Sequence, residues 1–202
     1  MKILLTDYSK PFFKDYLLPS GRLREPRKEA QRADIIIVTK AQSNTTESEM
    51  HDFENRVYSY CRSETPVFFS YLKYSEPSPL FDGIEKSEFE NVMVVSGIAN
   101  PINFEKYVAT KWNILKRFNF PDHHEYSHSD LSSIKSRWQE LSHKAPVIFT
   151  TEKDAVKLAT TEFRTLLDGL PIFIISIEMT FLQNGSKFDA LITDAVESKE
   201  EF

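Results

Sequence analysis

Six short runs of apolar, largely β-branched residues constrain the fold of this chain more than any other feature. They lie at residues 3–5, 35–38, 67–69, 92–95, 147–149 and 172–177. A strand with one face in water alternates apolar and polar residues, whereas a strand covered on both faces is apolar throughout. The runs therefore predict a parallel or mostly parallel β-sheet.

Helix-start signals recur between these runs. The expected caps are Thr46 with Glu49, Asn100 before Pro101, Ser129 or Asp130, and Thr151 with Asp154. Strands that alternate with helices predict an α/β fold, with the mostly parallel sheet flanked by helices. We expect residues 1–33 to form an N-terminal strand and a long basic and aromatic loop, residues 34–196 to form the α/β domain, and residues 197–202 to form a charged tail.

Composition excludes several classes of protein. Sixteen Phe and eight Tyr supply enough apolar surface for a core, so most of the chain is not disordered. Cys61 is the only cysteine, which excludes a disulfide scaffold and is consistent with a reducing compartment. No apolar run approaches the roughly 18 residues that a membrane-spanning helix needs.

The net charge of −5 is unevenly distributed. Residues 1–40 carry nine Lys and Arg against five Asp and Glu, so the rest of the chain is acidic, which argues against a general nucleic-acid binder. The basic cluster comprises Arg22, Arg24, Arg27, Lys28 and Arg32 and follows an aromatic stretch. It could face phosphates or an anionic membrane, although charge alone favours a solvated loop.

Polar residues that follow three apolar stretches, each interpreted as the end of a strand, are candidate functional groups. In open α/β sheets, ligands bind beyond the carboxyl ends of the strands. Gly97 and Asn100 lie in a turn that leads into a helix, where backbone amides can approach a phosphate. Thr151, Lys153 and Asp154 form a second corner that could position a nucleotide or Mg²⁺. An ordinary strand-to-helix connection and a capping box explain the same residues.

A third candidate follows residues 118–120. A carboxylate beside an imidazole orients it and raises its basicity, so Asp122 and His123 could act in proton transfer. A zinc site of His123, His124 and His128 is a weaker alternative, because Pro121 disfavours the regular helix that would align the imidazoles. A plain surface loop is a further alternative.

The recognisable phosphate-binding motifs are absent. The sequence contains no Gly-Lys dipeptide, and therefore no phosphate loop of the Gly-x-x-x-x-Gly-Lys-Ser/Thr type. It also contains no Gly-x-Gly-x-x-Gly and no Gly-x-Ser-x-Gly motif. By itself, the chain has no complete catalytic machinery of a known type.

Five segments together resemble a known family. They read LPSGRLREP at residues 18–26, RADIIIVTK at 32–40, SGIANP at 96–101, FPDHHEY at 120–126 and TEKDAVK at 151–157. In this order and at these spacings they resemble the tetraacyldisaccharide 4'-kinases of lipid A biosynthesis. In that family the phosphate loop precedes these segments, so the resemblance implies the C-terminal part of a P-loop kinase fold from which the P-loop lobe is missing.

The resemblance also implies a reaction and roles for individual residues. The family uses ATP and Mg²⁺ to phosphorylate the 4'-hydroxyl of a tetraacyldisaccharide 1-phosphate, at the cytoplasmic face of the inner membrane and without nucleic acid. His123, with Asp122, matches a catalytic element that pairs with a carboxylate base of the other lobe, and Arg24 matches an active-site arginine that Glu25 would orient. The C-terminal part of the kinase would be inactive without the P-loop lobe. The alternative is a non-catalytic module, derived from the kinase, that binds a nucleotide, a lipid or a protein partner.

Overall fold

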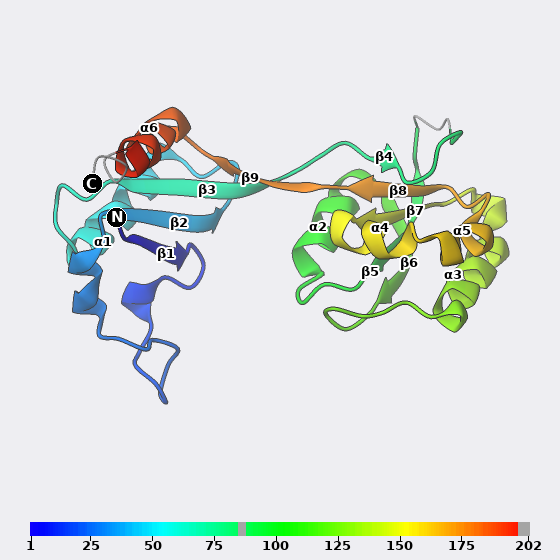
Figure 1. Cartoon of the computed structure of the whole chain (residues 1–202), viewed down its shortest axis with the longest axis horizontal. Helices are drawn as coiled ribbons and strands as arrows, with labels where there is room; N and C mark the ends of the chain where they lie inside the picture. Colours follow the sequence, from blue (N-terminus) through cyan, green and yellow to red (C-terminus); the bar gives the residue numbers. More distant parts are fainter. Residues whose placement is uncertain (85–87, 198–202) are drawn as a thin grey trace. The chain divides into compact units, whose positions relative to one another are not determined.

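The computed structural model describes residues 1–84 and 88–197, and these form two compact units (Figure 1). Unit 1 comprises residues 1–73 and the chain from residue 178 onward, and unit 2 comprises residues 74–177. The expected boundary at residue 33 does not separate the two units, because the segments on either side of it pair within one sheet. The division falls instead within strands that run from one unit into the other.

Unit 1 is built on a four-stranded sheet in the order β1-β2-β3-β9. The strands are β1 (Ile3–Asp7), β2 (Ile35–Ala41), β3 (Val67–Tyr74) and β9 (Ile177–Phe181). The first three strands are parallel, with Ile3 beside Ile35 and Ile36 beside Val67. This confirms the predicted parallel sheet for the three N-terminal runs.

The middle strand β2 is covered on both faces, which explains its unbroken apolar run. Ile36 and Val38 pack with Phe53 of helix α1 (Glu47–Tyr58) and with the 3₁₀ segments Phe12–Lys14 and Arg27–Arg32. Ile35 and Ile37 pack on the other face with Phe68 and with helix α6 (Gly185–Glu197). Because successive side chains of a strand point to opposite faces, both layers require apolar partners from β2.

Unit 2 is built on a five-stranded sheet in the order β4-β8-β7-β5-β6. The strands are β4 (Ser78–Pro79), β8 (Ile172–Ile175), β7 (Val147–Thr151), β5 (Asn91–Ser96) and β6 (Asn113–Asn119). Strands β8, β7, β5 and β6 are parallel, and the short β4 runs antiparallel to β8. The α/β class and the mainly parallel pairing are confirmed, but the strands form two sheets.

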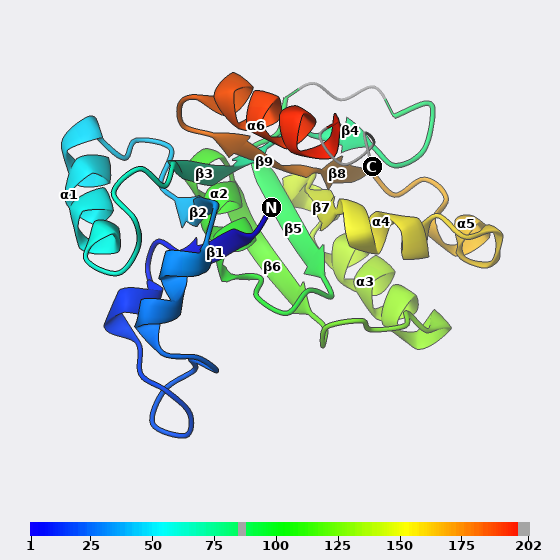
Figure 2. The same cartoon turned by 60° about the vertical axis from the view of Figure 1, so that its left-hand side comes forward.

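Helices cover both faces of the sheet in unit 2 (Figures 1 and 2). Helix α2 (Ile102–Lys111) packs Phe104 and Val108 against Val92 and Val94. Helices α3 (His128–Glu140), α4 (Glu152–Leu158) and α5 (Thr161–Leu167) pack on the face that carries Met93 and Val95. A short 3₁₀ turn, Ser142–Lys144, follows α3.

Two helix starts differ from the expected ones. Ser127, not Ser129 or Asp130, caps α3, with Asp130 as the reciprocal member of a capping box. Helix α2 starts after Pro101, and the Asn100 side chain accepts a hydrogen bond from the Ile102 N–H at 3.3 Å. The caps at Thr46 and Thr151 are confirmed. Residues 198–202 of the expected tail lie outside the described residues, and residue 197 ends α6.

Candidate functional site

The carboxyl ends of three neighbouring parallel strands in unit 2 carry most of the candidate residues. Strands β7, β5 and β6 are adjacent and parallel, so their carboxyl ends lie at one edge of the sheet. The turn after β5 contains Gly97 and Asn100, helix α4 begins directly after β7, and the turn after β6 contains Asp122 and His123. The fold therefore gathers seven of the candidates at one edge, as the strand-end argument predicts.

Asp154 joins the first two strand ends. Its carboxylate is fully buried, and Oδ2 accepts hydrogen bonds from the Gly97 N–H at 2.9 Å and from the Thr151 hydroxyl at 2.7 Å. The Thr151 Oγ1 in turn accepts a hydrogen bond from the Asp154 N–H at 3.2 Å. The Gly97 amide is thus engaged by a side chain, so these three residues form the frame of the edge. We no longer expect that amide to contact a ligand.

Gly97 is required at this position by a close approach rather than by its backbone angle. A Cβ placed there would lie 3.0 Å from Asp154 Oδ1 and 3.4 Å from His124 Cβ. Contacts below about 3.4 Å force a neighbour to move, and the buried carboxylate is held by its own hydrogen bonds. The glycine therefore serves the packing between β5 and α4.

Tyr126 completes this frame and was assigned no role from the sequence. Its side chain is buried and packs edge-on against Phe120 and His124. Burial, followed by the charge of nearby Asp154, raises the pKa of the Tyr126 hydroxyl far above its ordinary value. The phenol therefore stays protonated next to the buried carboxylate. Its place in the FPDHHEY segment was the only signal available in the sequence.

The exposed part of the edge is a row of three charged or titratable side chains. Lys153 Nζ donates a hydrogen bond to Asp122 Oδ1 at 2.7 Å, and His123 Nε2 lies 3.6 Å from Asp122 Oδ2. The hydrogen bond from Lys153, together with the adjacent His123, lowers the pKa of Asp122. A carboxylate held ionised in this way can orient the imidazole through a hydrogen bond.

His123 is also unusual in its backbone. Its φ of 62° is in the left-handed region, and its side chain is 79% exposed. Non-glycine residues adopt this region rarely, and such residues concentrate at functional sites. The turn thus presents the imidazole to solvent, where a group from outside this unit can reach it.

The other two histidines of the zinc alternative are engaged elsewhere. His124 Nε2 lies 3.1 Å from Asp130 Oδ2, and its ring stacks on Phe120. His128 Nδ1 lies 3.5 Å from a carboxylate oxygen of Glu162. Over residues 1–84 and 88–197, no group of three or more His, Cys, Asp and Glu side chains is placed to hold a metal ion. The geometry does not support the three-histidine site.

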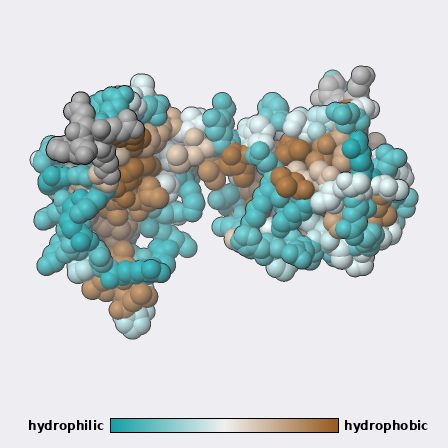
Figure 3. Space-filling model, viewed as in Figure 1, coloured by the Kyte–Doolittle hydropathy of each residue, from teal (hydrophilic) through white to brown (hydrophobic). Residues whose placement is uncertain are grey.

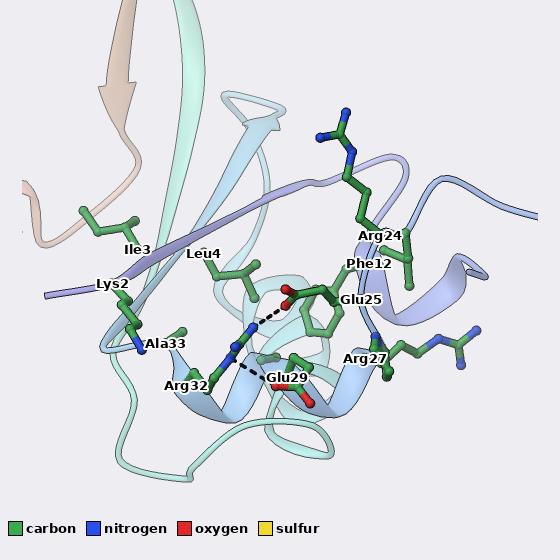
Figure 4. A pocket seen from close by; sticks show the side chains of 13 residues that line it. Lys2, Ile3, Leu4, Phe12, Arg24, Glu25, Arg27, Glu29, Arg32 and Ala33 are labelled. Atoms are coloured by element: carbon green, nitrogen blue, oxygen red, sulfur yellow. Dashed lines mark hydrogen bonds and ion pairs between the residues drawn. The ribbon is translucent and has the colours of Figure 1, made fainter. Parts of the chain in front are cut away.

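Arg24 and Glu25 belong to unit 1 and line a cavity of about 460 Å³ (Figure 4). Its wall is mainly apolar and includes Ile3, Leu4 and Phe12. Glu25 pairs with Arg32, which also contacts Glu29 at 3.1 Å, whereas Arg24 extends away from Glu25. The expectation that Glu25 orients Arg24 is therefore wrong in this structure. Arg24 makes no ion pair with any residue that the structure describes.

The residues that the structure describes do not by themselves build a site for Mg²⁺ or for a nucleoside triphosphate. A metal-bound triphosphate needs several converging carboxylate or hydroxyl ligands and a cradle of free backbone amides. The Asp122 carboxylate accepts a hydrogen bond from Lys153, and the Asp154 carboxylate accepts hydrogen bonds from Gly97 and Thr151. The described residues therefore supply an exposed histidine, an arginine and a frame, without a phosphate-binding loop.

Parallel strands covered on both faces, with polar turns at their carboxyl ends, define an α/β protein of the kind that binds its ligands at a sheet edge. The family model for tetraacyldisaccharide-1-P 4'-kinase (LpxK) matches residues 1–197, so the chain belongs to that family. This confirms the resemblance seen in the sequence. The family is one of kinases.

Curated relatives and a solved structure agree with this assignment. The tetraacyldisaccharide 4'-kinase of Phocaeicola vulgatus is 32% identical over 97% of this chain and 55% of the relative, and that of Parabacteroides distasonis is 31% identical over 98% and 56%. A crystal structure of LpxK from Aquifex aeolicus in complex with ATP aligns with a TM-score of 0.57 at 24% identity, covering 95% of this chain and 51% of that one. The chain thus spans about half the length of the relatives it matches.

Proposed function

We propose that this chain is the C-terminal part of a tetraacyldisaccharide 4'-kinase. In the proposed reaction, the 4'-hydroxyl oxygen of a tetraacyldisaccharide 1-phosphate attacks the γ-phosphorus of ATP, the bond to the ADP oxygen breaks, and the hydroxyl proton passes to a base. The family match over residues 1–197 carries this proposal, because it includes every candidate residue. ATP and Mg²⁺ would be held by a phosphate-binding lobe that this chain lacks.

The proposed contribution of the chain is positioning and charge. His123 would orient a carboxylate base of the other lobe and tune its pKa, with Asp122 holding the imidazole in place. Arg24 would stabilise negative charge on the transferred phosphoryl group, since its guanidinium has no carboxylate partner among the described residues. Asn100 and Lys153 would line the substrate side of the edge, and Thr151, Asp154 and Gly97 would hold it together. Glu25 would orient Arg32, with which it forms an ion pair in the structure.

Strand β1 supports the proposal that a further lobe joins unit 1. It lies at one end of the sheet order and, among the described strands, pairs only with β2. Ile3 and Leu5, which share a face with Ile35 and Ile37, are 40% and 63% exposed. An unpaired parallel edge with bare apolar side chains is a site for strand addition, and a helix that follows the added strand would cover Ile3 and Leu5.

The substrate class implies where the protein acts. A tetraacylated disaccharide resides in a bilayer, so we propose that the kinase works peripherally at the cytoplasmic face of the inner membrane. No helix over the described residues is long and apolar enough to span a membrane.

A complementation assay tests the proposal. The purified chain is mixed with the part of the Phocaeicola vulgatus relative that it does not cover, and transfer of phosphate to a tetraacyldisaccharide 1-phosphate is measured in detergent. We expect turnover only from the mixture, and its loss in His123→Ala but not in His143→Ala, an exposed histidine of the same unit. Full activity of His123→Ala would refute its assigned role.

The same mixture separates the kinase part from a non-catalytic module. A module would bind its nucleotide, lipid or partner without the added lobe and irrespective of His123→Ala. Absence of turnover from every mixture, together with such binding, would favour the module.

A further inference from the structure

Residues 15–28 of unit 1, a projecting loop that leads into the 3₁₀ segment Arg27–Arg32, are here called the finger, which is held together by its own backbone. The Leu18 N–H donates to the Leu23 carbonyl at 2.9 Å, the Leu23 N–H donates to the Tyr16 carbonyl at 3.0 Å, and the Gly21 N–H donates to the Leu17 carbonyl at 3.0 Å. A Cβ on Gly21 would lie only 2.2 Å from the Tyr16 carbonyl oxygen, so the turn accepts glycine alone. The finger is therefore preorganised.

Three consecutive side chains of the finger are apolar and exposed. Tyr16, Leu17 and Leu18 are 66%, 45% and 61% exposed, and Figure 3 shows hydrophobic residues near the end of this loop. Folding gains nothing from leaving two leucines and a tyrosine in water, and single exposed apolar residues are common whereas clusters are less so. Such a cluster is a candidate interaction surface.

The finger that carries this apolar cluster is basic. Residues 15–28 contain four Lys and Arg against two Asp and Glu. Arg22 is paired with Asp15 at 2.8 Å, whereas Lys28 is exposed and makes no ion pair with any residue in the described ranges. Arg27 contacts the finger at two points. Its Nε donates a hydrogen bond to the Asp15 carbonyl at 2.8 Å, and its guanidinium lies 5.2 Å from the centroid of the Tyr16 ring.

We propose that the finger inserts Tyr16, Leu17 and Leu18 into the headgroup region of an anionic bilayer. An apolar cluster on a basic loop, with Lys28 unpaired among the described residues, matches the boundary between acyl chains and lipid phosphates. Tyrosine favours this boundary because its ring is apolar and its hydroxyl is polar. A rigid turn inserts without first losing conformational entropy. The inference deepens the proposed function, on which it rests for the nature of the substrate, by naming the surface that meets the membrane.

Vesicle binding by the full 202-residue chain tests the inference. Co-sedimentation is measured with vesicles of phosphatidylglycerol and phosphatidylcholine in equal parts and with vesicles of phosphatidylcholine alone. We expect binding to the anionic vesicles that weakens with added salt. The double variant Leu17→Ser/Leu18→Ser should lower the affinity by about tenfold or more, since the two leucines together forfeit more than the ~1.4 kcal/mol that corresponds to tenfold.

Matched variants make the result specific. Met179→Ser and Val156→Ser remove exposed apolar side chains elsewhere and should leave vesicle binding unchanged. Lys28→Glu should weaken binding about tenfold at low salt, whereas Lys106→Glu, an exposed lysine of unit 2, should not. Equal binding by the leucine double variant and the unaltered chain, or equal binding to both kinds of vesicle, would overturn the inference.

A spectroscopic measurement reports insertion directly. An environment-sensitive fluorophore on Leu18→Cys should shift to the blue when anionic vesicles are added, while the same label on Met179→Cys should not. Cys61 is buried and is left unlabelled under native conditions. Because vesicle binding is measured without ATP and turnover is measured in detergent, loss of one without the other shows which of the two proposals has failed.

Discussion

The carboxylate of Asp154 accepts a hydrogen bond from the backbone N–H of Gly97, and this one contact joins the carboxyl ends of β5 and β7. The two residues are 57 positions apart, and the carboxylate is fully buried. The same carboxylate oxygen also binds the Thr151 hydroxyl that caps α4. The edge that displays His123 is therefore supported by a polar frame inside unit 2.

Replacing Asp154 with alanine should strongly destabilise unit 2. The substitution leaves the Gly97 N–H and the Thr151 hydroxyl buried without a partner, which we expect to cost about 2–4 kcal/mol. Trp112 and Trp138 are the only two tryptophans and both lie in unit 2, so fluorescence during urea unfolding follows this unit. Asp168→Ala, an exposed aspartate of the same unit, is the control. Equal midpoints for both variants would contradict the structural role of Asp154.

Replacing Gly97 with alanine should also destabilise unit 2, but by less. The added Cβ would lie 3.0 Å from Asp154 Oδ1, and the carboxylate cannot move without losing its bond to the Gly97 N–H. We expect a loss of about 1–3 kcal/mol, typical of overpacking. In the Asp154→Ala background the carboxylate is absent, so adding Gly97→Ala should cost little further stability. A double-mutant cycle measures this coupling, and strictly additive losses would argue against it.

Removing the Lys153 ammonium should raise the pKa of Asp122. The hydrogen bond from Lys153 is the largest cause of the lowered value, so in Lys153→Met the pKa should move back toward 3.8. Carboxyl ¹³C shifts followed through an acid titration give the value directly. Lys144→Met, an exposed lysine of the same unit, should leave it in place. An unchanged Asp122 pKa in Lys153→Met would show that the contact is absent in solution.

Asp7 should make the stability of unit 1 depend on pH. Partial burial alone would raise its pKa, but hydrogen bonds from Ser9 and Lys40 outweigh burial and lower it from 3.8 to about 2. Because the folded value lies below the unfolded one, the stabilisation is complete above about pH 4 and is lost as the pH falls toward 2. Allowing for solvent screening, it amounts to about 1–2 kcal/mol.

The variant Asp7→Asn tests this pH dependence. It should be less stable than the unaltered chain at pH 7 and equally stable near pH 2. Labelling of the buried Cys61 with 4,4'-dithiodipyridine, which reacts in acid, follows the opening of unit 1. Asp52→Asn, at an exposed position of the same unit, should show no such trend. A difference between Asp7→Asn and the unaltered chain that persists at pH 2 would argue against the assignment.

The strands that the sequence predicted well are those buried on both faces. In β2, Ile36 and Val38 contact one layer and Ile35 and Ile37 the other, so the pattern is apolar at every position. Only the end of strand β6, within the apolar stretch at residues 118–120, was indicated by the sequence, because the strand lies at the end of the sheet and carries Lys116 and Arg117 on exposed positions. An edge strand has no apolar signature of this kind, because only its pairing makes it a strand.

The candidate site was likewise predicted only in part from the sequence. Motif order brought in Arg24, and strand-end reasoning brought in Asp122 and His123, Gly97, and Thr151. Neither approach could show that Glu25 pairs with Arg32 rather than with Arg24, or that Tyr126 lies against Asp154. Such pairings depend on side-chain direction and on contacts between residues distant in sequence, which local pattern does not contain.

The sequence alone determined the α/β class, the parallel pairing, the caps at Thr46 and Thr151, and the family. These follow from local properties, namely apolar periodicity, hydrogen-bonding side chains at helix starts, and motif order. Only the tertiary structure decided that the strands form two sheets and that the Asp154 carboxylate binds Gly97 and Thr151 inside unit 2. It also decided that Tyr16, Leu17 and Leu18 are exposed on a rigid turn. Those outcomes depend on which distant residues exclude water from one another, and that is established only when the whole chain packs.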